Sequence, residues 1–346
     1  MANKTKDPKI VVVGGGSGSS AVLQGLKKFT TDITAVVTMF DSGGSSGLLH
    51  NEFGYPPLGD LRQCLLGLSE DDETTLAVRE LLGFRFQQES SLKGHSLGNL
   101  LLAALTTIGE DLELAIEKIS RLLRIHGQVI PVSLEWADLC AKLMDGEILR
   151  GESTIDLRGT STPYIDRVFL EHPVAANPQA IKAILQADLV ILGPGDLYTS
   201  VIPNLLADSI PEALTETKAT RVYVCNLMTK LGETDDFKAS DFVREMNSYL
   251  IAGSLDWVLI NSREIPEEVQ TAYLTEGARP VVFDLTSTQQ HVPGVFATFL
   301  SNNELPLKHD PERIAEAAMA LAGLGRVPEA DLNDRNRWHS ARSSSG

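Results

Sequence analysis

The sequence predicts an α/β fold in which helices cover both faces of a mostly parallel sheet. Apolar, β-branched runs alternate with helical patterns along the chain, which is typical of such sheets. The first run, residues 10–13, stops at a glycine cluster, and a helical pattern begins directly after it. Short β-like pieces follow one another over about residues 125–170 and predict a small β-rich lobe. Together these observations predict a Rossmann-like fold that carries such a lobe.

Apolar runs predict the individual buried strands, and apolar residues repeating about every 3.6 positions predict the helices. The expected strands of the main sheet are residues 9–13, 33–39, 188–192, 221–226, 257–260 and 280–283. The expected helices start after the first glycine cluster and near Gly59, and cover residues 74–82, 98–107, 112–123 and 239–250. The β-like pieces of the lobe are residues 129–132, 138–143, 147–151 and 167–170. Asp145-Gly146 signals a hairpin in the lobe, and Asp60 is expected to cap the helix beside it.

Composition and charge limit the classes of partner. The 346 residues are 43% hydrophobic and 22% charged, as in an ordinary globular protein. A net charge of −16 argues against nucleic acid or an anionic membrane as partner, but not against a phosphorylated small molecule. Without a signal core or a run of about 18 apolar residues, we expect a cytoplasmic protein with no membrane insertion. Residues 1–325 are expected to form one α/β domain, and the polar segment 326–346 to be disordered.

The cysteines and histidines give no sign of a metal site. The three cysteines lie far apart without a C-x-x-C pair, which predicts reduced, buried thiols. Glu233, Asp235 and Asp236 could bind a cation, but three acids in one loop are more often solvated. No metal site is therefore predicted, and Asp41 is the one weak candidate for a metal ligand.

Two glycine-rich segments follow the first two expected strands. Glycines at such turns let the backbone approach an anion, to which a helix N-terminus offers free N–H groups. Within the first segment, Gly16, Gly18 and Ala21 fit the G-x-G-x-x-G/A dinucleotide pattern, although a plain connecting turn is an equal alternative. If the backbone N–H groups of the two segments face each other, they form two neighbouring anion-binding sites, which suit a diphosphate or a nucleotide sugar. Asp41 could also be a turn or cap residue. The candidate ligand-binding residues here are Gly14, Gly15, Gly16, Ser17, Gly18, Asp41, Ser42, Gly43, Gly44 and Ser45.

Residues 94–98 match the G-x-S-x-G nucleophile elbow of α/β-hydrolases. That motif needs a buried strand before it, and the polar residues 87–91 do not resemble one, which disfavours a hydrolase. Ser96 and Asn99 are expected to cap the following helix, with His95 either close to a bound phosphate or bonded to the helix start. Asp60 and Arg62 are also candidates, Arg62 as a phosphate-binding cation or as half of a surface ion pair.

Polar residues also follow two later strands, where the carboxyl ends of a parallel sheet bring ligand sites together. They follow residues 188–192 and 221–226, and glycines again free the backbone there. The candidates are Gly193, Pro194, Gly195, Asp196, Leu197, Thr199, Ser200, Asn226, Thr229 and Thr234.

Six segments in fixed order resemble the CofD-like superfamily and, within it, the YvcK-type gluconeogenesis factors. They are residues 14–18, 41–47, 56–62, 94–99, 193–206 and 225–235, and the resemblance spans residues 8–325. It implies a Rossmann-like nucleotide-binding domain that binds UDP-sugars such as UDP-N-acetylglucosamine and supports gluconeogenic growth and cell shape. Tyr273 lies in a segment similar to the uridine-sugar site of these proteins, and Lys308 begins a segment similar to an Arg-His-Asn element. The role implied is regulatory, and is compatible with regulatory protein partners and a homo-oligomer.

The resemblance also implies an alternative. The founding enzyme of the superfamily, 2-phospho-L-lactate transferase, uses Mg²⁺ to move a phospholactyl group from a guanosine diphosphate carrier to a deazaflavin. This chain has Ser42 where that branch has a second acid, and Gly195-Asp196 where it has Ser-Asn. These departures disfavour metal-dependent transfer, in which Asp41 would place the Mg²⁺ cofactor, and they favour a nucleotide-sugar binder.

Overall fold

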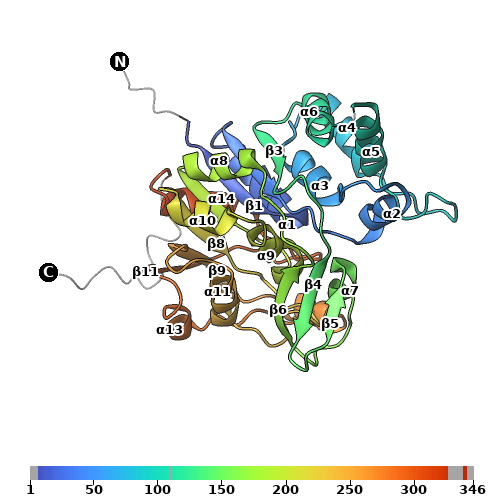
Figure 1. Ribbon diagram of the computed structural model, residues 1–346. Helices are drawn as coiled ribbons and strands as arrows, with labels where there is room; N and C mark the ends of the chain where they lie inside the picture. The colour runs from blue at the N-terminus through green and yellow to red at the C-terminus, as the bar shows by residue number, and fades with distance from the viewer. Residues whose placement is uncertain (1–6, 110, 326–337, 341–346) are drawn as a thin grey trace, which may run out of the picture.

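The computed structural model describes residues 7–109, 111–325 and 338–340. Its main sheet has eight strands in the order β11-β10-β9-β8-β7-β1-β2-β3 (Figure 1). All neighbours pair in parallel except β11, which pairs antiparallel with β10. The strands are β1 (Ile10–Gly14), β2 (Ile33–Val37), β3 (Gln128–Pro131), β7 (Leu189–Leu192), β8 (Thr220–Val224), β9 (Trp257–Asn261), β10 (Gly294–Thr298) and β11 (Trp338–Ser340). The predicted mostly parallel α/β sheet is confirmed.

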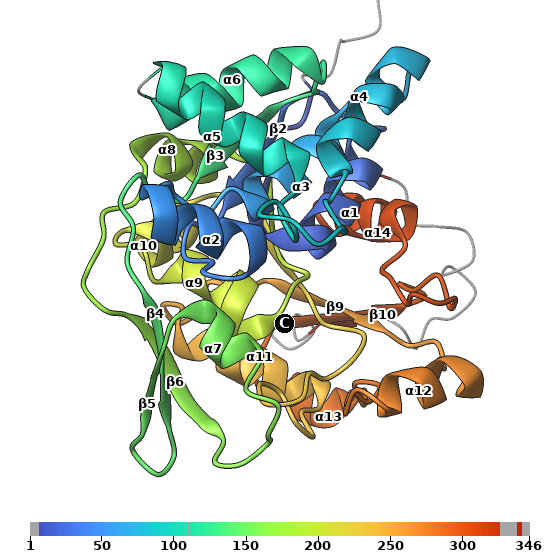
Figure 2. The ribbon, with the colours of Figure 1, turned by 90° about the vertical axis from the view of Figure 1, so that its right-hand side faces the viewer.

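Helices cover both faces of this sheet, as predicted. On one face α1 (Gly16–Leu26) packs between α3 (Gly59–Leu68) and α14 (Pro311–Leu321), and on the other lie α8 (Pro178–Gln186), α9 (Ile202–Leu205) and α10 (Ile210–Glu216) (Figure 2). The remaining helices are α2 (Gly44–Phe53), α4 (Glu73–Gly83), α5 (Leu97–Gly109), α6 (Leu112–Leu122), α7 (Glu152–Asp156), α11 (Ala239–Ser248), α12 (Glu267–Leu274) and α13 (Leu285–Thr288). None of the helices in the described ranges is long and apolar enough to cross a membrane.

The centre of the sheet lies at β1 and β7. Every residue of both strands is buried, because apolar side chains on both faces contact the helical layers. Val13 of β1 stands in register with Val36 of β2 on one side and with Leu192 of β7 on the other. The chain runs outward from β1 in one direction and from β7 in the other, so this is the point where the strand order reverses. Ligands of such sheets bind beyond the carboxyl ends of the strands at that point.

The β-rich lobe is a three-stranded antiparallel sheet in the order β5-β4-β6 (Figures 1 and 2). Its strands are β4 (Leu139–Leu143), β5 (Ile148–Arg150) and β6 (Ile165–Leu170), and the hairpin at Asp145-Gly146 joins the first two as predicted. Helix α7, which lies between β5 and β6 in the chain, packs against β4 and β5. The backbone N–H of Val168 donates to the Tyr249 hydroxyl at 2.8 Å, which links the lobe to the end of α11. The piece at residues 129–132 was expected in this lobe. It is instead β3 of the main sheet, because its buried apolar residues pair in parallel with β2.

Three other expectations are wrong in detail. Residues 280–283 form only isolated bridges to Met228 and Lys238, and the last parallel strand is β10, whose five residues are all buried. The second glycine-serine segment, expected to be a loop, becomes helix α2 at Gly44. Asp60 does not cap α3, because the helix starts at Gly59 with Leu58 in the cap position, and the Asp60 side chain turns toward α1.

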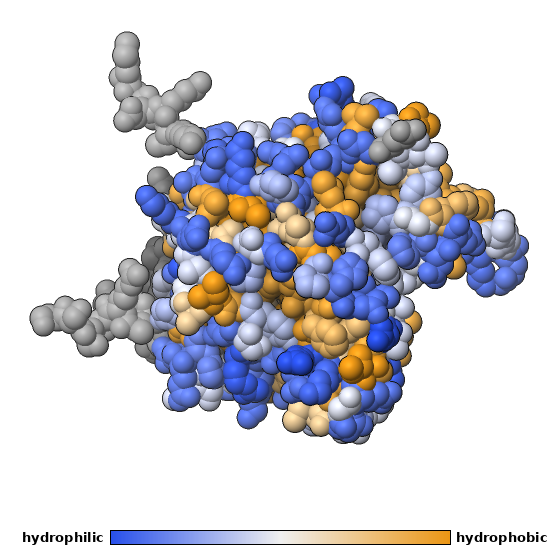
Figure 3. Space-filling view, in the orientation of Figure 1, coloured by the Kyte–Doolittle hydropathy of each residue, from blue (hydrophilic) through white to orange (hydrophobic). Residues whose placement is uncertain are grey.

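The segment 326–346 was predicted to be disordered. Residues 338–340 form β11 against the edge strand β10, so the prediction is wrong for them, and the rest of the segment lies outside the described residues. The prediction of free, buried thiols is confirmed for all three cysteines: Cys64, Cys140 and Cys225. On the face drawn in Figure 3, hydrophilic residues cover most of the surface and hydrophobic residues form small patches among them.

Candidate functional site

Two cavities lie beyond the carboxyl ends of the central strands. The first, of about 400 Å³, is bordered by the segments after β1 and β2 and is called here the glycine cavity, after Gly16, Gly43 and Gly44 in its lining. The second, of about 520 Å³, is bordered by the segment after β8 and is called the Asn226 cavity. Asp156 and Leu157, at the end of α7, line both. The two cavities therefore share one wall, which the β-rich lobe supplies.

Some of the predicted ligand-binding residues line one of the two cavities, and the others line neither. Those that line the glycine cavity are Gly16, Ser17, Asp41, Gly43, Gly44, Ser45, Asp60, Arg62 and Asn99. Those that line the Asn226 cavity are Asp196, Asn226, Thr229 and Tyr273. The others line neither cavity: Gly14, Gly15, Gly18, Ser42, His95, Ser96, Gly193, Pro194, Gly195, Leu197, Thr199, Ser200, Thr234 and Lys308.

The positions after β1 require glycine for different structural reasons. A Cβ at Gly15 would collide with the Asp60 carboxylate, and a Cβ at Gly18 would collide with the Pro194 carbonyl oxygen. These two glycines are therefore required by the packing of the protein itself. Gly16 differs, because it has a φ of +65°, and a Cβ there would only touch Asp60 Oδ1 at 3.8 Å. Its conformation suits glycine, and the open side faces the cavity where a ligand would approach.

Asp60 brings a carboxyl group to the N-terminus of α1. The backbone N–H of Gly16 donates to this carboxyl group, which is half-buried at the edge of the glycine cavity. Burial raises the pKa of Asp60 and the charge of Asp41 raises it further, to about 7, although the Gly16 N–H opposes the shift. The anion-binding end of α1 thus already holds an acid of the protein, and near neutral pH that acid carries only part of a negative charge.

Asp41 is joined in the cavity by a second acid that the sequence did not reveal. The Gly43 N–H donates to Asp41 Oδ1 at 2.7 Å, and the Ser42 N–H donates to Glu152 Oε2 at 3.4 Å. Burial, the charge of Asp41 and a hydrogen bond shared with Asp41 raise the pKa of Glu152 to about 9. Glu152 begins α7 in the β-rich lobe, 110 residues from Ser42, and no local pattern marks it. A second carboxyl group therefore lies beside Asp41, and it comes from the lobe.

Two arginines line the same cavity. Arg62 is only 6% exposed, and its Nε donates to Asn99 Oδ1 at 2.9 Å, so the alternative of a surface ion pair is wrong. Burial lowers the pKa of Arg62, and the neighbouring charge of Arg85 lowers it further. Among the described residues, no carboxylate forms an ion pair with either arginine. The charge of Asp60 acts on Arg62 from a greater distance, and the lining also holds Asp41, Glu152 and Asp156. Two cations that form no ion pair within the protein suit an anionic ligand.

The segment around His95 supports the cavity from behind. The Ser96 hydroxyl accepts the Asn99 N–H at 3.1 Å at the start of α5, as expected of a capping residue. Asn99 does not cap the helix, since its carbonyl oxygen accepts from Arg62. His95 is buried and shares a hydrogen bond of 3.2 Å with Ser45 in the first turn of α2. Because only an isolated bridge at Arg85 and Ser96 precedes α5, there is no nucleophile elbow.

The Asn226 cavity offers the neutral polar side chains of Asn226, Thr229, Tyr273 and His309, beside the charged groups of Asp156, Asp196, Lys230 and Glu276. Asn226 Nδ2 donates to the Gly195 carbonyl at 2.8 Å, whereas its Oδ1 is buried without a hydrogen-bond partner. The Tyr273 hydroxyl accepts the Leu307 N–H at 3.1 Å, which fixes the ring in the cavity wall. His309 donates from Nε2 to the Cys225 carbonyl at 3.2 Å, and burial lowers its pKa to about 4, so the ring is neutral. Such groups suit a base or a sugar better than a phosphate. Lys308 is exposed and lies outside the lining.

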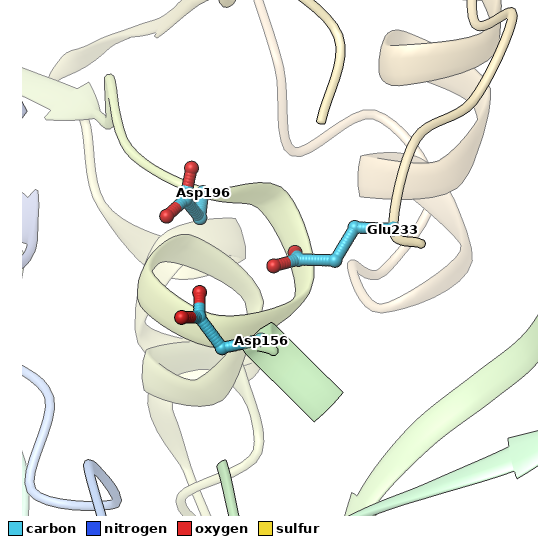
Figure 4. Close-up of side chains that lie close together, drawn as sticks. All are labelled: Asp156, Asp196 and Glu233. Carbon is cyan, nitrogen blue, oxygen red and sulfur yellow. The ribbon is translucent and has the colours of Figure 1, made fainter. Parts of the chain in front are cut away.

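Three carboxylates surround a lysine beside the Asn226 cavity. Asp156 ends α7, Asp196 follows β7 and Glu233 follows β8, and Figure 4 shows their carboxylates turned toward one another. The Lys230 Nζ contacts Asp156 and lies 2.7 Å from Asp196 and 3.1 Å from Glu233. Burial alone lowers the pKa of Lys230, but the charges of Glu233 and Asp196 outweigh it and raise the pKa above its ordinary value.

The acids at 233–236 therefore differ from the expected solvated cluster. Glu233 is only 3% exposed, and burial raises its pKa to about 7 against the opposing charge of Lys230. Asp235 accepts the Gly232 N–H at 2.8 Å within its own turn. Asp236 is 71% exposed at its side chain, beside Arg279 at 3.6 Å, so only this acid meets the expectation. The sequence analysis did not single out Asp156 or Lys230. Their contacts join three segments that are separate in the chain, so no local pattern marks them.

Comparisons with known proteins agree with this architecture. The family model of 2-phospho-L-lactate transferase CofD matches residues 10–300. The gluconeogenesis factor of Bacillus subtilis (strain 168) is 44% identical over 319 residues, which are 91% of this chain and 98% of that protein. The gluconeogenesis factor of Halalkalibacterium halodurans is 39% identical over 317 residues, or 91% and 96% of the two chains. A crystal structure of a protein from Bacillus halodurans has a TM-score of 0.86 and 39% identity, and the match covers 91% of this chain and all of that one. The chain therefore belongs to the CofD family, in the group of the gluconeogenesis factors.

Proposed function

We propose that this gluconeogenesis factor binds a nucleotide diphosphate sugar of the UDP-N-acetylglucosamine type across the two cavities. In this role it regulates central carbon metabolism and cell shape, and does not turn the ligand over. The observation that carries the proposal is the pair of arginines, Arg62 and Arg85, which line one cavity and form no ion pair with any described carboxylate, in a chain of net charge −16. Such a pair at the carboxyl ends of parallel strands supports an anionic ligand. The names of the related proteins support the metabolic role.

The diphosphate belongs in the glycine cavity. There the two guanidinium groups and the first turn of α2, around Gly44 and Ser45, offer positive partial or full charge. Asp60 and Glu152 lessen the opposing negative charge, because their raised pKa values keep both at least partly protonated near neutral pH. The cavity can therefore hold an anion without a metal ion.

The nucleoside and the sugar belong beyond the shared wall, in the Asn226 cavity. The unpartnered Asn226 Oδ1 is an acceptor suited to an N–H group of a base, as in the imide of uracil. Tyr273 supplies an aromatic surface and Thr229 a hydroxyl in the same lining. A ligand with an anionic centre and neutral hydrogen-bonding ends matches this order of groups.

One observation favours the alternative, a Mg²⁺-dependent enzyme like 2-phospho-L-lactate transferase. Asp41 and Glu152 share a hydrogen bond in the glycine cavity, and a pair of carboxylates that can share a proton can also bind a divalent cation. In that reading Asp41 places Mg²⁺ against a diphosphate that is then cleaved. The two functions differ in whether ligand binding requires the metal and whether the ligand survives.

Titration calorimetry with UDP-N-acetylglucosamine tests the proposal. Arg85 is exposed at the cavity, so Arg85→Met should leave the fold intact and weaken binding by about 1.5–3 kcal/mol, as for a lost charge-assisted hydrogen bond. Arg121→Met, on the far helix α6, is the matched control and should bind like the parent. The proposal fails if the parent does not bind, or if both variants bind equally well.

A further inference from the structure

The carboxylates of Asp156, Asp196 and Glu233, called here the acid triad, have the arrangement of a cation site. One oxygen from each lies within 4.8 Å of the other two. This spread fits oxygen ligands at 2.0–2.6 Å from one central hard cation, the range typical of Mg²⁺ and Ca²⁺. The ligands come from three different segments, α7 and the loops after β7 and β8, so they are brought together by the fold (Figure 4).

A second observation shows that this cluster is built to hold a positive charge. The Glu233 side chain has no exposed surface, and its Oε2 is buried without any hydrogen-bond partner. In Figure 4 this carboxylate points toward the other two acids. The Thr199 hydroxyl donates to its other oxygen, Oε1, at 3.2 Å and fixes the side chain. A buried carboxylate with an unused oxygen is costly unless a cation lies beside it.

The cation present is the ammonium group of Lys230. It contacts all three acids, so one formal positive charge is set against three carboxylates. A lysine has three N–H donors, and here each acid accepts from or pairs with it. Lys230 thus joins the end of α7 to the loops after β7 and β8 as a metal ion would.

We propose that the acid triad is a divalent-cation site in which Lys230 takes the place of the metal. Without this ammonium group, the three carboxylates would bind a hard divalent cation of the Mg²⁺ or Mn²⁺ class. The site is separate from the Asp41–Glu152 pair. Asp156 lines both cavities, Asp196 and Lys230 line the Asn226 cavity, and Glu233 lines neither. If the proposed function holds, Lys230 makes this part of the ligand site independent of metal.

Lys230→Met in the full chain tests the proposal, with binding of free Mn²⁺ followed by electron paramagnetic resonance. The variant is expected to bind one more Mn²⁺ ion than the parent, through the three carboxylates that Lys230 no longer occupies. Glu233→Gln added to Lys230→Met should abolish that ion, because the buried ligand is lost. Lys182→Met, exposed on α8, is the matched control and should bind like the parent.

The same measurement overturns the proposal if Lys230→Met binds no more Mn²⁺ than the parent, or if the double variant keeps the extra ion. Should Lys230→Met unfold without metal, its thermal unfolding is repeated with Mn²⁺ present. A site of this kind then restores cooperative unfolding and raises the melting temperature by about 4 °C at ~100 times Kd. Failure of Mn²⁺ to restore folding contradicts it. No nucleotide enters these measurements, so failure of the proposed function is seen separately, in calorimetry of the parent.

Discussion

Gly16 is the residue whose conformation bears most directly on the ligand. Gly16→Val should lower the affinity for the nucleotide sugar by about 1–3 kcal/mol, because a branched side chain is strained at a φ of +65° and blocks backbone approach. Calorimetry gives the affinity, and circular dichroism shows whether the variant is folded. Gly83→Val is the control, since a Cβ there meets open space and its φ is not positive. Unchanged affinity in a folded Gly16→Val protein would contradict the proposed phosphate contact.

Asp60 should make folding stability depend on pH. Its pKa rises from 3.8 in the unfolded chain to about 7 in the folded protein, so the folded state holds the proton more tightly. Its contribution is therefore full below pH 4, declines as pH rises to about 7, and is level above that. The total is on the order of 4 kcal/mol, at about 1.4 kcal/mol for each pKa unit.

Asp60→Asn should consequently make the decline in stability between pH 5 and pH 7 shallower than in the parent, as measured by urea unfolding at several pH values. Glu152 and Glu233, whose pKa values are also raised, leave a residual slope. The parent should lose stability over this range, and the exposed-site control Asp208→Asn should follow the parent. A profile for Asp60→Asn that declines as steeply as that of the parent would show that another group carries the dependence.

Arg62 is both a wall of the glycine cavity and a proposed ligand group. Arg62→Lys keeps a positive charge but loses the planar fork and the Nε contact to Asn99, so nucleotide-sugar affinity should fall clearly. Arg62→Ala should lower it further, since the charge is also lost. Calorimetry of both variants distinguishes them, and equal, parent-like binding by the two would remove Arg62 from the site.

At the scale of elements, α7 decides between the binder and the transferase. If the diphosphate is held without metal, EDTA should leave affinity nearly unchanged. Glu152→Gln should then bind like the parent, because its amide can still donate to Asp41. If Mg²⁺ sits between Asp41 and Glu152, affinity should collapse in EDTA and in Glu152→Gln alike. Calorimetry with and without Mg²⁺ separates the two outcomes.

The elements that the sequence predicted well are those with one strong local signal. Buried runs such as β1 and β7 are continuous and apolar, and the glycines after them mark the turns. β10 was missed because Gly294 and Ala297 weaken its pattern, and residues 280–283 were chosen in its place. Helix α2 was missed because glycine and serine are weak helix formers, and contacts elsewhere in the fold override that preference.

The candidate site shows the same limit. The glycines, Asp41 and Asn226 could be found because they follow apolar strands closely. Asp60 and Arg62 could be found because they lie at the start of a predicted helix. Glu152, Asp156 and Lys230 could not, because the lobe and the segment after β8 meet only in the folded chain. Their positions depend on tertiary contacts between segments that lie about a hundred residues apart or belong to different layers.

At the scale of the whole molecule, chemistry identifies the site better than size does. A larger cavity, of about 950 Å³, lies by β3 and α6 and includes Asp111, Glu113 and Glu117, with no arginine or lysine in its lining. That lining disfavours a phosphate group. The two smaller cavities lie at the carboxyl ends of the strands around the β1–β7 reversal, where the arginines are. The account therefore places the nucleotide sugar there.

The central claim is that the protein holds an intact nucleotide diphosphate sugar, and mass analysis tests it most directly. The purified protein is incubated at length with UDP-N-acetylglucosamine and Mg²⁺, then denatured, and the released nucleotides are weighed. The account predicts one intact UDP-sugar per binding site and no cleavage products. Steady, Mg²⁺-dependent turnover of a nucleotide-diphosphate donor that Asp41→Asn abolishes would contradict it and establish the transferase in its place.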